Sequence, residues 1–537
     1  MNKRISAVAL GIALLGGTLA SRASADELGK GEIKHVLLIS VDGLHALDVA
    51  NYVKSHKGSA LAELASHGFT YSSANTPTNS DSFPGLLALV TGSSPLTSGL
   101  FYDVSYNRSI FDPTNTTCQG QPGNMQVFDE SIDQYAGAPP NQVSQNKIDP
   151  AALPNYINED GKCGRKFPHN ALRTNTIFEI VKANSGITAW ADKHPAYDLV
   201  NGPSGKGVDD LYTPEVTNFN GFDNTVSVVC TFRNDFLKVQ AVLNEINGLR
   251  DDGKTSLGGT PAVLGMNFQA VSVGEKLSID NSAKGCPNDQ FTGQPGGYTD
   301  GAGTPTAVLE YGLDQTDQAL RMMINALKAR HIYDSTLFIV TAKHGQTPIN
   351  PVKTNKPGHF ADLVAALPDA STNPAALAIA AANNCSTGPC GFVQDDDIAL
   401  IWLQDQSQTA AVAAYLNTNA KALFIDEVMA GHELEIKFND PSKDPATPDI
   451  IVRPNYGTIY TGSTAKNAEH GGFNYSDTNV GLVVSNPGLS ARTIKSPVAS
   501  SQVAPTILKA LGIDPEKLNA VQIEGTKVLP FLFQDQQ

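Results

Sequence analysis

Short apolar segments of strand length recur along the chain and alternate with helical segments. The clearest are residues 35–41 (HVLLISV), 336–342 (TLFIVTA) and 480–484 (VGLVV). A run that is apolar at nearly every position is typical of a strand buried on both faces of a parallel sheet. Further helices are expected over 59–66, 82–91, 174–183, 311–330 and 501–511, and a further strand over 186–190. The alternation predicts an α/β fold in which helices sandwich a mixed, mostly parallel sheet with right-handed crossovers.

Four polar stretches rich in Gly, Pro, Asn and Asp are too long to be ordinary connections between such elements. We expect them to be loop-rich insertions over the carboxyl edge of the sheet, which is the active-site edge in α/β enzymes. They cover about residues 101–172, 200–225, 276–305 and 350–396. The prediction is a single domain over residues 26–537 that carries these insertions.

The N-terminus has the features of a secretory signal peptide over residues 1–25. Lys3 and Arg4 precede an apolar run over residues 5–20, and an Ala-Ser-Ala cleavage motif follows at residues 23–25. A membrane anchor is the alternative, but the run is short for a span and no stop-transfer pattern follows. We therefore predict an exported protein, periplasmic or secreted, that is not attached to a membrane after cleavage.

All six cysteines follow the predicted cleavage site, so they meet an oxidising compartment in which disulfides persist. They are Cys118, Cys163, Cys230, Cys286, Cys385 and Cys390. Six thiols allow fifteen pairing schemes. The pair Cys385–Cys390, which is close in a loop-like segment, is the first choice, and the other pairings stay open.

The charge balance is acidic, with 38 Lys and Arg against 53 Asp and Glu and a formal net charge of −15. No basic run is present, which argues against binding to a nucleic-acid backbone. An anionic substrate must therefore be held locally, by a metal ion or by a few lysines. The sequence does not indicate an oligomeric state.

Polar residues stand next to several predicted strands: Asp42, the pair Lys343-His344, and His470. Each alone is more typical of a cap or a local polar contact. Ser82 lies just before a helix that opens near Pro84, where the positive end of the helix would stabilise an alkoxide. An N-cap role for Ser82 or its neighbour Asp81 is the alternative.

In this order the motifs resemble the type I phosphodiesterase / nucleotide pyrophosphatase family of the alkaline phosphatase superfamily. They are "SVDGL" at Asp42, "SFPGLLALVTGSSPLTSG" from Ser82, "AKHGQ" at His344 and "EHGG" at His470. The resemblance continues to "VAPTILKALGI" from Val503 and covers most of the chain except the insertions.

The resemblance implies an alkaline-phosphatase-like fold and hydrolysis of phosphate esters at two metal ions, commonly zinc. By position in the motifs, Ser82 is the nucleophile, which forms a phospho-enzyme and is also a metal ligand. Asp42 and His344 are further ligands of the same metal, and His470 is a ligand of its partner.

Four positions depart from the family pattern. Val271 and Glu275 stand where the family has an Asp and a His ligand, Lys343 replaces an Asp, and Asp103 replaces an Asn. Valine cannot bind a metal and an ammonium repels one, whereas Glu275 offers an oxygen. We therefore expect one divalent ion, zinc, rather than two.

The ligands expected for this ion are a subset of Asp42, Ser82, Glu275, His344 and His470. The Lys343 ammonium would border a metal position and stabilise the transition state, with Asp42, Asp103 and Glu275 as counter-charges. Ser82, Lys343 and Asp103 are thus the predicted catalytic residues.

A segment over residues 189–205 follows a predicted strand and runs past the mouth of the site in the family pattern. Asp192, Lys193 and His194 offer a replacement ligand or a phosphate contact, and ordinary surface-loop chemistry is the alternative. Only His194 is retained as a candidate substrate or ligand contact.

The resulting prediction is a hydrolase of small anionic phosphate esters or anhydrides, of the nucleotide phosphodiester or pyrophosphate type. A phosphomonoesterase, a sulfatase or a phosphonate hydrolase is the alternative within the superfamily, because one fold serves several charged esters. A non-catalytic binding protein is the alternative from another class. Val271 and Lys343 favour that alternative, and the retained Asp42, Ser82, His344 and His470 oppose it.

Overall fold

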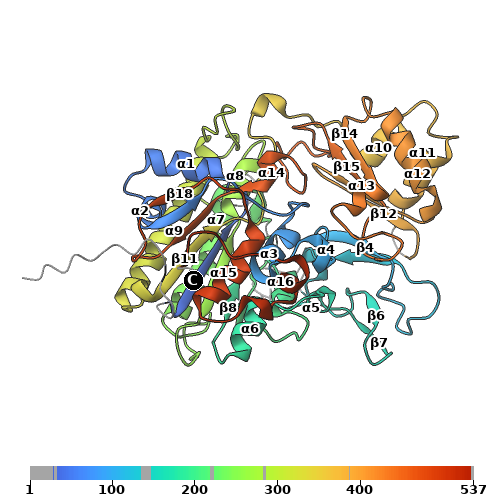
Figure 1. Cartoon of the computed structure of the whole chain (residues 1–537). Helices are drawn as coiled ribbons and strands as arrows, with labels where there is room; N and C mark the ends of the chain where they lie inside the picture. The colour runs from blue at the N-terminus through green and yellow to red at the C-terminus, as the bar shows by residue number, and fades with distance from the viewer. Residues whose placement is uncertain are drawn as a thin grey trace, which may run out of the picture.

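The core of the protein is an eight-stranded sheet with the order β18-β2-β17-β11-β1-β10-β8-β9 (Figure 1). The computed structural model describes residues 28, 33–134, 147–217, 223–281, 286–385 and 388–533, so the predicted signal peptide lies outside the described residues. The strands are β1 (His35–Val41), β2 (Gly68–Tyr71), β8 (Ala189–Ala191), β9 (Asp210–Tyr212), β10 (Val263–Phe268), β11 (Thr336–Thr341), β17 (Leu482–Ser485) and β18 (Arg492–Ile494). Strand β17 is antiparallel to both neighbours, and every other pair is parallel.

The central strands are buried along their whole length, as their continuous apolar sequences predict. Helices cover both faces of the sheet (Figure 1). One group is α1 (Ala46–Ser55), α2 (Ala60–Ser66), α7 (Val228–Ile246), α8 (Ala270–Lys276) and α9 (Ala307–Ala329). The other is α3 (Ser82–Thr91), α6 (Ile177–Ala183), α15 (Val503–Ala510) and α16 (Asn519–Glu524). The predicted α/β fold class is confirmed.

A second lobe with its own hydrophobic core lies beside the sheet (Figure 1). Its antiparallel sheet has the order β12-β13-β15-β14. The elements are α10 (Phe360–Ala365), α11 (Pro374–Asn383), β12 (Gly391–Asp395), β13 (Ala399–Leu403), α12 (Thr409–Thr418), β14 (Ile425–Ala430), α13 (His432–Glu435) and β15 (Ile450–Pro454). The interval 350–396, which we expected to be loop-rich, therefore begins a packed lobe. Its helix α11 is mostly alanine, which gives little apolar periodicity to find.

The insertion over 101–172 joins this lobe to the core. It forms a hairpin of β4 (Val104–Asn107) and β5 (Asn124–Val127), followed by β6 (Asn155–Ile157), β7 (Cys163–Arg165) and α5 (Pro168–Ala171). Phe101 and Tyr102 pack with Trp402 of β13 in a third apolar cluster. The Tyr102 hydroxyl contacts Asp396 of the lobe at 3.1 Å and the His470 carbonyl at 3.0 Å. The lobe is thereby anchored next to a predicted site residue.

Three disulfides link all six cysteines. The predicted pair Cys385–Cys390 is present, and the other two pairs are Cys118–Cys163 and Cys230–Cys286. Within the described part of the chain, no helix is both long and apolar enough to cross a membrane.

Candidate active site

The register of the central strands brings several polar residues to one edge of the sheet. Strand β1 pairs in parallel with β10 on one side and with β11 on the other, nearly to the strand ends. Asp42 follows β1, Gln269 follows β10, and Lys343 lies two residues beyond β11. These side chains therefore emerge together at the carboxyl edge, where α/β sheets bind ligands.

Ser82 is the first residue of helix α3, and its hydroxyl is free for the site because Asp81 caps the helix. The Asp81 carboxylate accepts from the Phe83 amide at 3.0 Å. The helix can approach the β11 loop because residue 85 is glycine: a Cβ there would lie 2.1 Å from the Lys343 carbonyl oxygen. The N-terminus of α3 thus places the Ser82 hydroxyl beside the residues that follow β11.

Lys193 and His344 contact the Ser82 hydroxyl, and Tyr197 also forms a side-chain hydrogen bond with Ser82. The Lys193 ammonium donates to Ser82 Oγ at 3.1 Å, and His344 Nε2 lies 3.1 Å from the same atom. His344 Nδ1 lies 3.0 Å from the Gly345 carbonyl, so the Nδ1–H group can donate a hydrogen bond there and leave the Nε2 lone pair directed at Ser82. Burial, the largest influence, lowers the pKa of His344 to about 3, so the ring is neutral.

Asp42 and two lysines form a buried charge cluster behind Ser82. Asp42 Oδ2 lies 3.0 Å from the Lys193 ammonium, 3.3 Å from the Lys343 ammonium and 3.1 Å from the Asn267 amide. Burial alone would raise the pKa of Asp42, but Lys193 and Lys343 outweigh it and hold the pKa far below its ordinary range. Asp42 is therefore held as a carboxylate.

Lys343 is the more deeply buried of the two lysines. Its ammonium lies 3.6 Å from Asp192 Oδ1, 3.0 Å from the Tyr197 hydroxyl and 4.4 Å from the centre of the Tyr197 ring. Burial lowers the pKa of Lys343 and the two aspartates oppose that shift, whereas the pKa of Lys193 is raised because Asp42 and Asp192 outweigh its burial. Lys343 contacts neither Asp103 nor Glu275, which we had expected as counter-charges; Asp192 takes that place.

The His470 ring packs against the His344 ring in a tilted arrangement, with ring centres 3.8 Å apart. Its Nδ1 lies 3.7 Å from Asp81 Oδ2, and neither atom has a hydrogen-bond partner among the described residues. Burial raises the pKa of Asp81 to about 7, and the nearby charge of Asp103 adds to that shift. Asp103 itself accepts from the Val104 amide at 2.7 Å, and burial raises its pKa as well. These two carboxyl groups border the site, and in the part of the chain that the structure describes neither forms a hydrogen bond with the Ser82 hydroxyl.

His194 lies behind the helix that carries Ser82. Its ring packs against Tyr197 and Phe83, with centres 4.7 Å and 6.0 Å apart. Burial and the charges of Lys193 and Lys343 keep its pKa well below the ordinary value. The neighbouring Lys193, which we had set aside in favour of His194, is the residue that contacts Ser82. The position of Lys193 shortly after a predicted strand was the signal that the sequence offered. The contact of the Lys193 side chain with Ser82 is visible only in the structure.

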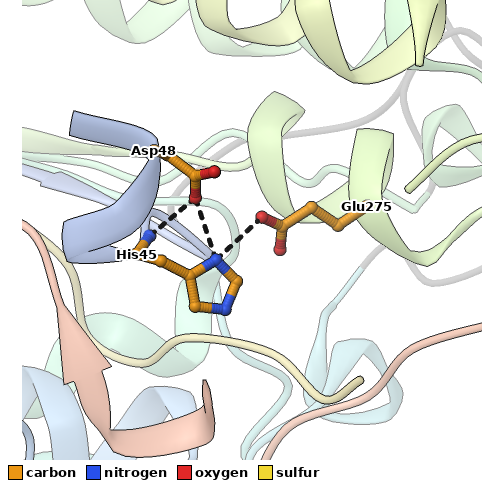
Figure 2. A group of neighbouring side chains, drawn as sticks. All are labelled: His45, Asp48 and Glu275. Atoms are coloured by element: carbon orange, nitrogen blue, oxygen red, sulfur yellow. Dashed lines mark hydrogen bonds and ion pairs between the residues drawn. The ribbon is translucent and has the colours of Figure 1, made fainter. Parts of the chain in front are cut away.

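Glu275 does not join this cluster. Its carboxylate contacts His45, Tyr298 and Gln346 on the other side of the β1–α1 turn. Figure 2 shows Glu275 directed at His45 and Asp48. The turn passes close to it because residue 43 is glycine with φ +87°, where a Cβ would lie 2.6 Å from Glu275 Oε2.

Three donors at the active-site edge lie close enough together to hold a metal ion. Asp42 Oδ1 is buried without a hydrogen-bond partner and lies 3.8 Å from His344 Nε2, which also faces Ser82. These three donors could hold one ion. Of the positions that the resemblance assigns to a second ion, His470 is at this edge. Val271 is a buried hydrocarbon side chain, and the Glu275 carboxylate contacts His45 instead.

A buried serine at a helix N-terminus, facing a histidine and charged residues at the carboxyl edge of a mostly parallel sheet, defines a hydrolase of the alkaline-phosphatase type. The family model described as "Type I phosphodiesterase / nucleotide pyrophosphatase" matches residues 36–136 and 288–476, which is more than half of the chain. The chain belongs to this family, and the predicted enzyme class, phosphoric ester hydrolase, is confirmed. No curated protein sequence gives a significant match.

Solved structures share the fold at low sequence identity. Alkaline phosphatase PafA, solved as a mutant, is 13% identical with a TM-score of 0.56, and the match covers 94% of this chain and 100% of that one. Murine ectonucleotide pyrophosphatase / phosphodiesterase 5, solved in complex with AMP, is 11% identical with a TM-score of 0.50, covering 90% and 96%. At such identities the likeness shows the fold alone.

Proposed function

We propose that the protein is an exported hydrolase of small phosphate esters or anhydrides, of the nucleotide phosphodiester or pyrophosphate type, and that Ser82 is its nucleophile. The observation that carries the proposal is the position of Ser82 Oγ, 3.1 Å from both the Lys193 ammonium and His344 Nε2 at the start of α3. A hydroxyl so placed has a fixed cation and a helix N-terminus to stabilise its ionised form.

In the proposed reaction, Ser82 Oγ gives up its proton to solvent and forms a bond to phosphorus while the bond from phosphorus to the ester or anhydride oxygen breaks. The leaving group departs with that oxygen, which takes up a proton from water. Water then attacks the phosphoserine and releases Ser82. Lys193 lies within reach of Ser82 Oγ and would neutralise charge on the nucleophile and on a phosphoryl oxygen. Lys343 supports it by sharing Asp42 and by adding positive charge behind the site.

Asp42, Ser82 and His344 would hold one divalent ion, zinc in our proposal, with His470 packed against His344 as a further donor at the same edge. Such an ion lowers the pKa of a bound hydroxyl and withdraws charge from a phosphoryl oxygen. Asp81 and Asp103 border the site, and burial raises the pKa of both carboxyl groups. Asp103 is proposed as a catalytic residue because it stands at the family's asparagine position, and His194 as a residue that supports the pocket.

The substrate class follows from the family and from the charge pattern. Cationic side chains surround Ser82 although the chain is acidic overall, which suits a small anion held by local contacts. The murine neighbour was solved with AMP, which supports a nucleotide as the first compound to test. The three disulfides support an oxidising, extracytoplasmic location.

The decisive experiment is a turnover screen with Ser82→Ala as the negative variant. Chromogenic phosphate diesters, phosphate monoesters, sulfate esters and a nucleotide pyrophosphate are each tested with zinc, manganese or magnesium and after chelation. We expect the largest kcat/KM with a phosphate diester or pyrophosphate and a loss of at least about 10³-fold in Ser82→Ala. A covalent phosphoserine on a tryptic peptide that contains Ser82 would identify the nucleophile directly.

Ser442→Ala is the matched control, because Ser442 is exposed and bonds only within its own turn through Asp440. It should keep full activity. Turnover that persists in Ser82→Ala would contradict the assigned nucleophile. No turnover with any substrate and metal, in a protein with unchanged circular dichroism, would instead favour a binding protein.

A further inference from the structure

A second cluster of ionisable side chains is buried beside the active site and has no role in the proposed reaction. It consists of His45, Asp48, Glu275 and Tyr298, which come from the β1–α1 turn, from α1, from α8 and from the loop before α9 (Figure 2 shows the first three). The side chains of His45, Asp48 and Glu275 are each at most 2% exposed. Two carboxylates here face a single histidine.

The contacts within the cluster outnumber the protons that are available to make them. His45 Nδ1 lies 2.9 Å from Asp48 Oδ2, 2.9 Å from the Tyr298 hydroxyl and 3.3 Å from Glu275 Oε1. The Tyr298 hydroxyl lies 3.0 Å from both Asp48 oxygens and 2.6 Å from Glu275 Oε1. His45 and Tyr298 bring one proton each to these six contacts, and a protonated Glu275 would bring a third. One central cation would satisfy all four groups at once.

The surroundings of the cluster have the arrangement that metal ligands require. His45 Nε2 lies 3.0 Å from the Gln346 carbonyl, so its N–H can donate there and leave the Nδ1 lone pair directed into the cluster. The backbone amide nitrogen of Gln346 also lies 3.0 Å from His45 Nε2. The ring can therefore carry its proton on Nε2 or on Nδ1, and a cation bound at Nδ1 would select the form with the proton on Nε2. The Gln346 side chain donates to Glu275 Oε2 at 2.6 Å, which leaves Oε1 for the cluster.

We infer that His45, Asp48, Glu275 and Tyr298 form a binding site for one divalent transition-metal ion, separate from the ion at Ser82. With the His45 ring deprotonated, as an ion ligand requires, the two carboxylates would leave a charge of −2, which a divalent ion cancels. The nitrogen and oxygen donors suit zinc or manganese. Calcium takes six to eight oxygens at about 2.3–2.6 Å, and this compact cluster offers too few.

The spacing of the donors is close to that of a four-coordinate ion. Ligand atoms around an ion with bonds of about 2.1 Å lie about 3.4 Å apart, against 2.6–3.3 Å for the pairs that include His45 or Tyr298. The donors would have to separate by several tenths of an ångström. The role that follows is structural: the ion would join the β1–α1 turn to α8 directly behind Asp42.

The test is a count of zinc per chain in variants that separate the two sites. The purified protein is loaded with zinc, freed of excess metal by dialysis and analysed by mass spectrometry of the metal. His344→Gln is the background, because it weakens the ion at Ser82. We expect one ion per chain in His344→Gln and none when Glu275→Gln is added. His56→Gln is the matched control: His56 lies 3.4 Å from Glu310 in a half-exposed cluster and should leave the count unchanged.

Tyr298→Phe keeps the aromatic ring and removes only the oxygen, so it covers the case in which Glu275→Gln does not fold. It should weaken zinc binding in the His344→Gln background at least about 10-fold, with cobalt absorption bands changed in parallel. A His344→Gln protein that binds no ion, or equal counts with and without Glu275→Gln and Tyr298→Phe, would overturn the inference and assign the cluster to shared protons. Neither result depends on enzyme activity, so the proposed function is tested separately.

Discussion

Two buried clusters share the β1–α1 turn and balance their negative charge in different ways. Asp42 points toward Ser82 and contacts two lysines, whereas His45, three residues later, points to the opposite side and contacts two carboxylates. Among the described residues, no lysine or arginine forms an ion pair with Asp48 or Glu275. The active-site edge therefore carries its own cations, and the second cluster needs a proton or a bound ion.

The difference teaches why a metal-site pattern can be altered without losing the fold. A buried carboxylate must be paired, but the chemistry of its partner is free to change. At Asp42 the partners are ammonium groups fixed to the chain, which cannot be removed by a chelator. Glu275 stands at a position where the family resemblance implies a metal ligand, but its carboxylate contacts His45 instead. The predictions below test each half of this comparison.

Among the variants that compare the two clusters, the largest effect is expected from Lys193→Met at the active-site edge. Methionine keeps the length and apolar packing of the side chain but removes the cation that contacts Ser82 Oγ. We expect kcat/KM to fall about 10²–10³-fold, the range for loss of a single donor to a developing charge. Steady-state kinetics with the best substrate from the screen measures it. An unchanged kcat/KM would mean that the Lys193 ammonium does not stabilise the reaction. The control is Lys206→Met, because Lys206 lies on an exposed turn.

The next effect is expected from Glu275→Gln in the second cluster. The amide cannot accept from Tyr298 and Gln346 as the carboxylate does, so buried polar groups lose partners. We expect the free energy of unfolding in urea to fall by about 1–3 kcal/mol. If the cluster holds an ion, zinc should stabilise the wild type and have no effect on this variant. A variant as stable as the wild type with and without zinc would contradict both expectations.

A smaller effect is expected at a third buried pair, Asp397 of the second lobe and Asp477 of the core, which has neither a lysine nor a histidine bonded to it. Burial and the partner carboxyl group raise the pKa of Asp397 well above its ordinary value, and burial raises that of Asp477 to about 6. The folded protein therefore holds protons that the unfolded chain has released above about pH 4. The contribution of this pair to the free energy of unfolding should fall as the pH rises from about 4 through 6 and beyond.

Asp397→Asn should flatten this pH dependence, because the amide supplies the hydrogen bond without a titrating proton. Urea unfolding at several pH values between 4 and 8 measures the slope. The control is Asp369→Asn, at an exposed residue in the same lobe. A wild-type slope that Asp397→Asn leaves unchanged would show that the pair does not hold the proton.

The smallest effect is expected from His56→Gln, in the half-exposed group with Glu310 and Asp314. Water already solvates these charges, so the free energy of unfolding should change by less than about 0.5 kcal/mol. Thermal and urea unfolding measure it. A larger loss of unfolding free energy would mean that the half-exposed cluster stabilises the protein as a buried cluster does, which would contradict the role given to burial.

Much of the fold was predictable because its information is local. The strands over residues 35–41 and 336–342 are apolar at successive positions, and they appear as β1 and β11. The helix predicted over 311–330 is α9, which begins slightly earlier where Thr306 caps it. The second lobe was missed because its elements are short and separated by turns, and because alanine contributes little to an apolar pattern.

The sequence by itself determined the fold class, the family and the order of Asp42, Ser82, His344 and His470, since strand pattern and motif spacing are properties of short segments. Only the tertiary structure decided which charges meet. Lys193 reaches Ser82 because β8 ends beside β10, and Glu275 turns to His45 because α8 packs behind the β1–α1 turn. Those contacts join residues more than a hundred positions apart, so no local pattern encodes them.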